Sequence, residues 1–288
     1  MANMRLIRRR ITGVQSIAKI TRAMEMIATS KMRKTQERGL AGRPYAEKIQ
    51  QVISDLAAIP GDGVTLHPLL QRREKKKIAM VHITTDRGQC GGLNANINRN
   101  AGTFIMEQTA PVSLICVGRK GTDFMRRYGR DIRAEFTKLG DQPGLLDTLP
   151  ISRIIIDDYT NGQIDAAYIS YTQFVTTLNQ RPVIQQILPV QPAELPRSTN
   201  VEYIYEPDAA GVLAGLLPRF VEMEIYHAIL EAIASEQSAR MVAMRNATQN
   251  AKDLVSDLTL MYNKARQESI TRELLDITAG VSALSGED

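Results

Sequence analysis

The chain has 288 residues, of which 43% are hydrophobic, and a formal net charge of +5; this length accommodates one large domain or two small ones. No apolar run approaches the roughly 18 residues that a transmembrane helix needs, so we expect a soluble or peripheral chain. The two cysteines, Cys90 and Cys116, have no metal-site spacing and form no disulfide framework, which favours reduced thiols in a cytosolic or matrix-side protein.

Residues 1–58 are predicted to form an N-terminal coiled-coil segment that carries most of the positive charge. The first 50 residues hold 12 Lys and Arg against 3 Asp and Glu, a net charge of +9. Such a helix binds nucleic acid, anionic lipid or an acidic protein surface, or is a solvated face. The first 44 residues contain no aromatic side chain on which bases could stack, which disfavours nucleic acid.

Apolar side chains recur in this segment at alternating spacings of three and four residues, which predicts packing against a neighbouring helix. The main stripe contains Ile7, Ile11, Val14, Ala18, Ala28 and Met32, with Thr21 and Glu25 between them, and a second stripe contains Ile17, Ile20, Met24 and Ile27. We expect the helix to break between Gly39 and Pro44. The first 24 residues lack acidic side chains, as transit segments do, but the repeat begins at Ile7, so we assign them to the mature structure.

In residues 76–190 the spacing of apolar side chains differs from the helical repeat, and this segment is predicted to form a central three-layer, Rossmann-like α/β domain. The expected strands are 77–85, 113–118, 132–136, 166–171, 183–189 and 201–205, and the expected helices are 93–106, 119–127 and 145–159. Strands that alternate with helices of this length favour a sheet with both faces covered. Prolines at positions 182, 189, 192 and 196 indicate an exit loop, and residues 191–208 are assigned to a return loop and foot.

Sheets of this kind are common in enzymes, so nucleotide binding is an alternative. Residues 87–92 follow a strand and open a helix, where phosphate-binding loops lie. The segment matches neither GxGxxG nor the loop that ends in Gly-Lys-Ser or Gly-Lys-Thr. A tight turn between strand and helix is therefore the simpler interpretation.

Side chains with catalytic potential are also scattered. Cys90 lies in the turn without a histidine positioned to activate it, since His67, His82 and His227 fall in a loop, a strand and a core position of the C-terminal helix. Asp157 and Asp158 end a predicted helix and are interpreted as surface charge. We predict no catalytic residue, no cofactor and no metal site.

Residues 209–288 are predicted to form the C-terminal coiled-coil helix. Between Pro218 and Gly280 the chain runs for 61 residues without proline or glycine, and a 3-4 spacing from Leu216 to Ala265 is apolar at 12 of 15 positions. Sustained heptads of this kind indicate a coiled coil, here a rod of roughly 90 Å. Its expected partner is the N-terminal helix, in an antiparallel pair; a local helical bundle is the alternative. Pro218 marks a kink or the helix start.

Four segments, taken in order, resemble one family. Residues 20–34 (ITRAMEMIATSKMRK), 84–94 (TTDRGQCGGLN), 235–248 (SEQSARMVAMRNAT) and 262–273 (YNKARQESITRE) are similar to the gamma subunit of F-type ATP synthase. The resemblance implies a non-catalytic subunit, the central shaft inside a ring of alpha and beta subunits. Ion flow through a membrane ring of c subunits would turn this shaft and drive conformational change at catalytic sites on beta.

The resemblance also implies contact residues. The positions that match the family's contacts with beta-subunit loops are Met24, Arg240, Gln267, Thr271 and Glu273, and those at the foot, facing the rotor ring and the epsilon subunit, are Tyr205, Glu206 and Asp208. The heptad fades after Ala265, so we expect the last turns to contact other subunits as a single helix. Each position is otherwise ordinary helix surface.

A peripheral place on the cytoplasmic side of a bacterial cell membrane is implied as well, with membrane contact only through the complex. The run 127–145 leaves no room for the insertion that photosynthetic members carry, which favours a bacterial source. Two other classes stay open at this point: a coiled-coil nucleic-acid binder, and an α/β enzyme with a helical dimerisation arm.

Overall fold

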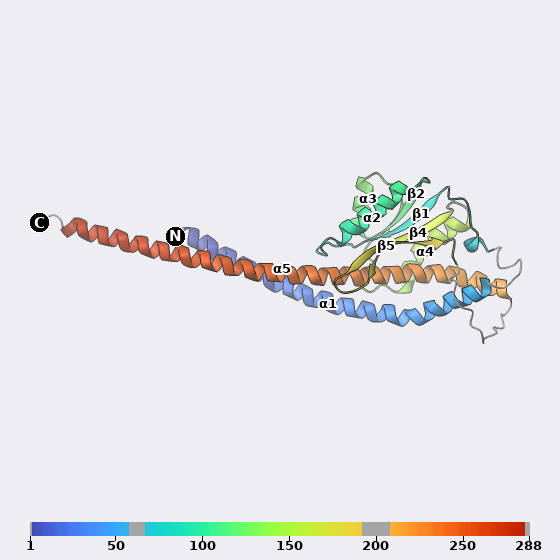
Figure 1. The fold of residues 1–288 in the computed structure, drawn as a ribbon, viewed down its shortest axis with the longest axis horizontal. Helices are drawn as coiled ribbons and strands as arrows, with labels where there is room; N and C mark the ends of the chain where they lie inside the picture. Colours follow the sequence, from blue (N-terminus) through green and yellow to red (C-terminus); the bar gives the residue numbers. More distant parts are fainter. Residues whose placement is uncertain (1, 58–66, 192–207, 286–288) are drawn as a thin grey trace. The chain divides into compact units, whose positions relative to one another are not determined.

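The computed structural model describes residues 2–57, 67–191 and 208–285, and it divides into two compact units (Figure 1). The helical unit comprises residues 1–27 and 241–288, and the α/β unit comprises residues 28–240. Two long helices, α1 (Ala2–Ala57) and α5 (Ala209–Ser285), contribute to both units. The unit boundary therefore falls inside both helices; the four-part division predicted from the sequence stays a prediction.

The α/β unit is built on a five-stranded sheet in the order β3-β2-β1-β4-β5. The strands are β1 (Ile78–Ile83), β2 (Val112–Val117), β3 (Ile132–Phe136), β4 (Ala166–Phe174) and β5 (Gln180–Leu188). β1 pairs in parallel with both β2 and β4, so that Ile78 lies between Val112 and Ala166. β5 runs antiparallel to β4 at one edge of the sheet, where Pro182 is tolerated because an edge strand can leave amide positions outside the ladder.

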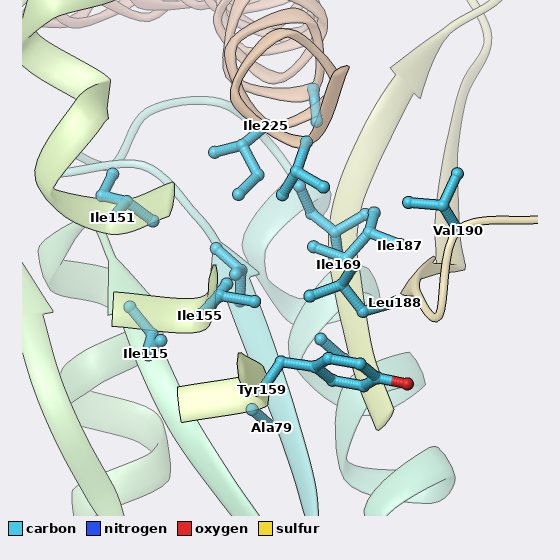
Figure 2. Packing of buried hydrophobic residues seen from close by; sticks show 14 of the residues in the cluster. Ala79, Ile115, Ile151, Ile155, Tyr159, Ile169, Ile187, Leu188, Val190 and Ile225 are labelled. Atoms are coloured by element: carbon cyan, nitrogen blue, oxygen red, sulfur yellow. The ribbon is translucent and has the colours of Figure 1, made fainter. Parts of the chain in front are cut away.

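Helices cover both faces of the sheet, which confirms the predicted three-layer arrangement (Figure 1). α2 (Leu93–Glu107) and α3 (Arg119–Arg127) pack on one face through a cluster that includes Ile105 and Met125. α4 (Leu145–Thr160) and the α/β-unit parts of α1 and α5 pack on the other, where Ile155, Ile169 and Ile225 meet (Figure 2). β1 is buried at every position because both faces are covered.

A short 3-10 helix, η1 (Pro68–Leu70), precedes β1 and lies beside the end of β5. The side chain of Leu69 is buried, and its carbonyl oxygen accepts a hydrogen bond of 2.9 Å from the amide of Val190, just after β5. The predicted central strands and helices are otherwise confirmed within a few residues at their ends. The predicted strand 201–205, and Pro192 and Pro196, lie outside the described residues.

The expected break between Gly39 and Pro44 is wrong, because α1 continues through Pro44 to Ala57. A proline inside a helix removes one backbone hydrogen bond and costs about 3 kcal/mol. Beyond it, Ile49 and Ile53 are buried in the core cluster of the α/β unit, and burial of that size offsets the cost. Pro218 likewise lies inside α5 and is not its start.

In the helical unit, α1 and α5 pack as an antiparallel pair. The hydroxyl oxygens of Thr21 and Thr248 lie 2.7 Å apart, and Arg245 donates a hydrogen bond of 3.1 Å to Glu25 one turn along. Residue numbers rise on one helix as they fall on the other, which sets the direction. The buried positions of α5 in this unit follow the predicted heptad and are Met241, Met244, Thr248, Ala251 and Leu258.

Other positions of the helical unit are open to solvent. The second stripe on α1 is more than half exposed at Ile17, Ile20 and Ile27. On α5, the described residues from Ile270 to Val281 are all exposed, so burial ends close to the predicted limit at Ala265. Among the described helices, none is both long enough and apolar enough to cross a membrane.

Candidate functional site

The carboxyl edge of the sheet is where proteins with this strand order bind ligands, at the point between β1 and β4 where the order reverses. In this chain α5 lies at that point and bonds to the loops on both sides. Arg240 donates to the carbonyl oxygen of Gly88 after β1 (3.2 Å), while Ser235 donates to that of Thr172 in β4 (2.9 Å). Ser238 donates to the carbonyl oxygen of Thr177 in the β4–β5 turn (2.8 Å). Three side chains of α5 therefore bond to backbone carbonyls at this edge of the sheet.

Asp86 holds three of the loops at this edge together. One carboxylate oxygen accepts from the amide of Arg119 at the start of α3 (3.0 Å), and the other from the amide of Lys138 after β3 (2.9 Å). Lys138 has a positive φ of 63°, which orients its amide in the loop. A Cβ at Gly118 would lie 2.1 Å from the carbonyl oxygen of Thr84, so only glycine fits this close approach of two loops.

Arg240 is oriented by Glu236, one turn earlier on α5. The Nη2 atom of Arg240 lies 2.6 Å from Oε1 of Glu236, and only 14% and 16% of the two side chains is exposed. Burial raises the pKa of Glu236, Arg240 opposes that rise, and the carboxylates of Asp141 and Asp86 add to it. The pair is thus a largely desolvated ion pair in a region that already contains negative charge.

A second bridge lies beside the first. Asp141, in the loop before α4, accepts from Nζ of Lys31 on α1 (2.6 Å) and from Nε2 of Gln237 on α5 (3.2 Å). Gln237 is 2% exposed although it is polar, so this hydrogen bond satisfies a group that would otherwise be costly to bury. The loop thereby connects both long helices within the α/β unit.

The geometry gives these groups no hydrolytic or transfer chemistry. Cys90 is buried, and burial together with Glu236 raises the pKa of its thiol, which favours the unreactive protonated form. His82 is fully buried between Asn98 (2.8 Å) and Ser170 (3.3 Å), and burial lowers its pKa to about 4. His67 caps η1, with Nδ1 3.3 Å from the amide of Leu69. The described residues contain no cluster of side chains suited to hold a metal ion.

The interpretation of Asp158 as surface charge is wrong. Its side chain is 7% exposed and lies 2.6 Å from Nη2 of Arg133 in β3. The helix end that carries it faces the neighbouring strand, so the carboxylate is paired there. Asp157, one residue earlier, is exposed as expected.

The predicted contact residues fall in different places. Arg240 belongs to the α/β unit and turns inward, whereas Met24 lies half-buried on α1 in the helical unit. Gln267, Thr271 and Glu273 are exposed on α5 in the helical unit.

Of the predicted foot residues, Tyr205 and Glu206 lie outside the described residues. Asp208 is exposed and accepts a hydrogen bond of 2.6 Å from the amide of Gly211, which caps the start of α5. Within the described residues, Asp208 therefore serves as a helix cap, and its predicted role in partner contact stays a prediction.

Sequence reasoning missed the residues that fill the carboxyl edge: Asp86, Asp141, Ser235, Glu236, Gln237 and Ser238. A signal was present, because Gln237 occupies a core position of the heptad and a polar group there needs a partner. The identity of that partner depends on long-range packing and could not be inferred from spacing.

Comparison with known proteins gives concordant matches. A family model described as ATP synthase matches residues 3–284. ATP synthase gamma chains of Dehalococcoides mccartyi (strain 195) and Chloroflexus aurantiacus are 69% identical over 285 residues and 49% identical over 289 residues, in each case covering 99% of this chain and 100% of the relative.

Solved structures agree on the fold. The rotor of the Euglena gracilis mitochondrial ATP synthase has a chain with a TM-score of 0.66 and 20% identity, covering 93% of this chain and 99% of that one. A chain of the Tetrahymena thermophila mitochondrial central stalk and c-ring has a TM-score of 0.62 and 24% identity, covering 79% and 99%. At these identities the likeness concerns the fold.

Proposed function

The chain belongs to the ATP synthase gamma chain family, and from this premise we propose that it is the central rotor shaft of an F-type ATP synthase. It couples ion flow through the membrane rotor ring to conformational change at catalytic sites on the beta subunits. It supplies no catalytic group of its own. The nucleic-acid binder and the α/β enzyme with a dimerisation arm have no support from the relatives.

The observation that carries this proposal is the construction of α5. In the α/β unit it is hydrogen-bonded to the loops at the sheet edge, and in the helical unit it pairs with α1 through a buried heptad stripe. From residue 219 to residue 279 the helix contains no proline or glycine, so this stretch has no residue of the kind that usually kinks a helix. A shaft that transmits torque needs a stretch of this kind.

The partners follow from the same reading. Solved relatives of this fold come from assemblies described as rotor, as central stalk and c-ring, and as F1 with c-ring. For this chain the partners are alpha and beta subunits around the helical unit, and the epsilon subunit and a ring of c subunits at the foot. Of the predicted foot residues, Asp208 is the one within the described part of the chain. Because its relatives are bacterial, we place the complex on the cytoplasmic side of a cell membrane.

The contacts with beta-subunit loops involve Met24, Gln267, Thr271 and Glu273. The last three are exposed on a stretch of α5 where heptad burial has ended, so their polar groups are available to another protein. Ser269 lies 3.4 Å from Glu273 and steadies its carboxylate on the helix surface. Arg240, the fifth predicted contact residue, bonds within the chain to Glu236 and to the carbonyl oxygen of Gly88.

Co-purification and reconstitution test the function. The tagged full chain, produced together with the other ATP synthase subunits of its source, should bring down alpha and beta subunits, and inverted vesicles that contain the complex should pump ions on addition of ATP. A triple variant Q267A/T271A/E273A should assemble but pump fewer ions per ATP hydrolysed. A triple variant at exposed positions of the α/β unit, R72A/E107A/R127A, is the matched control. Purification without the catalytic subunits would contradict the proposal.

A further inference from the structure

The β1–α2 loop (Thr84–Gly92) is held firmly at both ends and by one arginine near its middle. At the start, Asp86 binds two neighbouring loops through backbone amides. At the end, Asn94 donates hydrogen bonds to Thr85 (2.8 Å) and to the sulfur of Cys90 (3.3 Å). Between these ends, Gln89 and Gly91 adopt left-handed backbone conformations with φ of 65° and 58°. The turn therefore departs from regular structure where Arg240 binds it.

Arg240 is suited to hold this turn because its own position is fixed. Glu236 lies four residues earlier on the same helix and accepts a hydrogen bond of 2.6 Å from Nη2, the atom that also donates to the carbonyl of Gly88 at 3.2 Å. Both side chains are largely buried, so water competes weakly for these bonds. A hydrogen bond with a charged donor is also stronger than a neutral one.

We propose that Arg240 is a positioning residue for coupling: it latches the β1–α2 loop, which carries the buried thiol of Cys90, to α5. With this latch, residues 235–240 of α5 bind the loop that follows β1, the turn that follows β4 and the loop before α4. Arg240 is also the last residue of the α/β unit on α5. The part of the inference that concerns coupling rests on the proposed function; the latch itself does not.

The solvent accessibility of the Cys90 thiol can be used to measure whether the latch is closed. Its side chain is 2% exposed, and both Glu236 and Arg240 act electrostatically on its thiol. Release of the turn from α5 would expose the Cys90 sulfur to solvent, whereas Cys116 is fully buried in β2, in the core cluster that α2 and α3 cover. With Cys116→Ser as background, Cys90 is the single thiol of the chain. The rate at which a maleimide labels Cys90 then measures how often the loop opens.

The test compares four variants in that background, both as the full chain and in the assembled complex. R240Q should raise the labelling rate by about tenfold or more, as expected for loss of a charge-assisted hydrogen bond. E236Q keeps an acceptor but loses the charge and should give a smaller rise, and R240K should restore part of the protection. R245Q is the matched control, because Arg245 also lies on α5 but belongs to the helical unit, where it pairs with Glu25 of α1; it should change labelling by less than about twofold.

Coupling is read from ions pumped per ATP hydrolysed in inverted vesicles. R240Q should assemble in normal yield and lower this ratio, and R240K should recover it in part; a merely structural role would lower the yield and leave the ratio unchanged. Unchanged labelling of Cys90 in R240Q would overturn the latch. Increased labelling with an unchanged pumping ratio would overturn its role in coupling. Failure to assemble with partner subunits in the unmodified chain would instead count against the proposed function, since labelling of the full chain is measured independently.

Discussion

The hydroxyl oxygens of Thr21 and Thr248 lie 2.7 Å apart in the buried seam between α1 and α5 in the helical unit. Thr248 donates to the carbonyl oxygen of Met244 (2.8 Å), so it can accept from Thr21 across the seam. A polar pair in an apolar seam favours one axial register, because a shift of either helix would separate the two hydroxyls and leave each only carbonyl oxygens of its own helix as partners. The pair thus sets how α1 and α5 are aligned.

Replacing one threonine of this pair should lower the free energy of unfolding more than replacing both. T21V or T248V removes the hydrogen bond across the seam and leaves the other hydroxyl only a carbonyl of its own helix, which should lower the free energy of unfolding by about 0.5–1.5 kcal/mol. The double variant T21V/T248V should recover most of this loss, because valine has nearly the same shape and both polar groups are gone. Urea denaturation of the wild type, the two single variants and the double variant gives the four free energies of a double-mutant cycle. Additive losses would show that the two hydroxyls do not interact.

Glu25 should make the stability of the chain depend on pH. Burial on its own raises the pKa of this carboxyl, but Arg245 and Arg22 outweigh burial and lower it below the ordinary value of 4.5. A carboxyl with a lowered pKa stabilises the folded state above pH 4.5, and the contribution disappears as the pH falls through the lowered value. The unfolding free energies of the wild type and E25Q should therefore differ at pH 7 and converge in acid.

The control for this effect is E37Q. Glu37 pairs with Arg33 on the same helix, but both side chains are mainly exposed and the pair contributes little. Denaturation of E37Q from pH 7 to pH 3 should follow the wild-type curve closely. Parallel curves for E25Q and the wild type at all pH values would mean that the arginines do not stabilise the charge of Glu25.

Features that depend on local periodicity were predicted correctly from the sequence, whereas features that depend on contacts between distant segments were not. Heptad spacing identified the buried face of α5, including the polar position Thr248, and apolar runs located the strands. The continuation of α1 past Pro44 depends on Ile49 and Ile53, which are buried against the α/β core, and no local pattern carries that information.

The candidate site was harder to predict for the same reason. Asp158 is paired because β3 places Arg133 beside it, and Arg240 turns inward because Gly88, 152 residues away, offers a carbonyl. Motif likeness identified Arg240 as important, but its partner depends on how α5 packs against the sheet edge. Residue type and spacing limit the candidates, and tertiary contacts assign their roles.

Gly42 allows α1 to approach α5 closely in the α/β unit. A Cβ at this position would lie 2.8 Å from Cε1 of His227, whereas a Cβ at Gly39 would have no neighbour within 4 Å. Both glycines are inside a helix, where alanine is favoured by about 1 kcal/mol. G39A should therefore raise the free energy of unfolding by roughly that amount, while G42A should gain nothing or lose stability because the imidazole must move. Equal stabilisation in thermal denaturation would contradict the close packing.

His82 should add a second pH dependence between mild acid and neutrality. Its neutral ring is satisfied when Nε2 donates to Asn98 and Nδ1 accepts from Ser170, and burial lowers its pKa from 6.5 to about 4. The unfolded chain then takes up a proton first as the pH falls, so stability is complete above pH 6.5 and declines toward pH 4. The shift corresponds to a loss of about 3 kcal/mol.

Urea denaturation between pH 7.5 and pH 4.5 measures this loss, with H82Q as the test variant. Glutamine does not titrate, so H82Q should be less stable than the wild type at pH 7.5 but lose less stability on acidification. H67Q is the comparison, because His67 is only half-buried at the cap of η1 and its replacement should leave most of the slope in place. A slope that H82Q leaves intact would mean that the proton is taken up elsewhere, and His82 would then be a packing residue without a titration role.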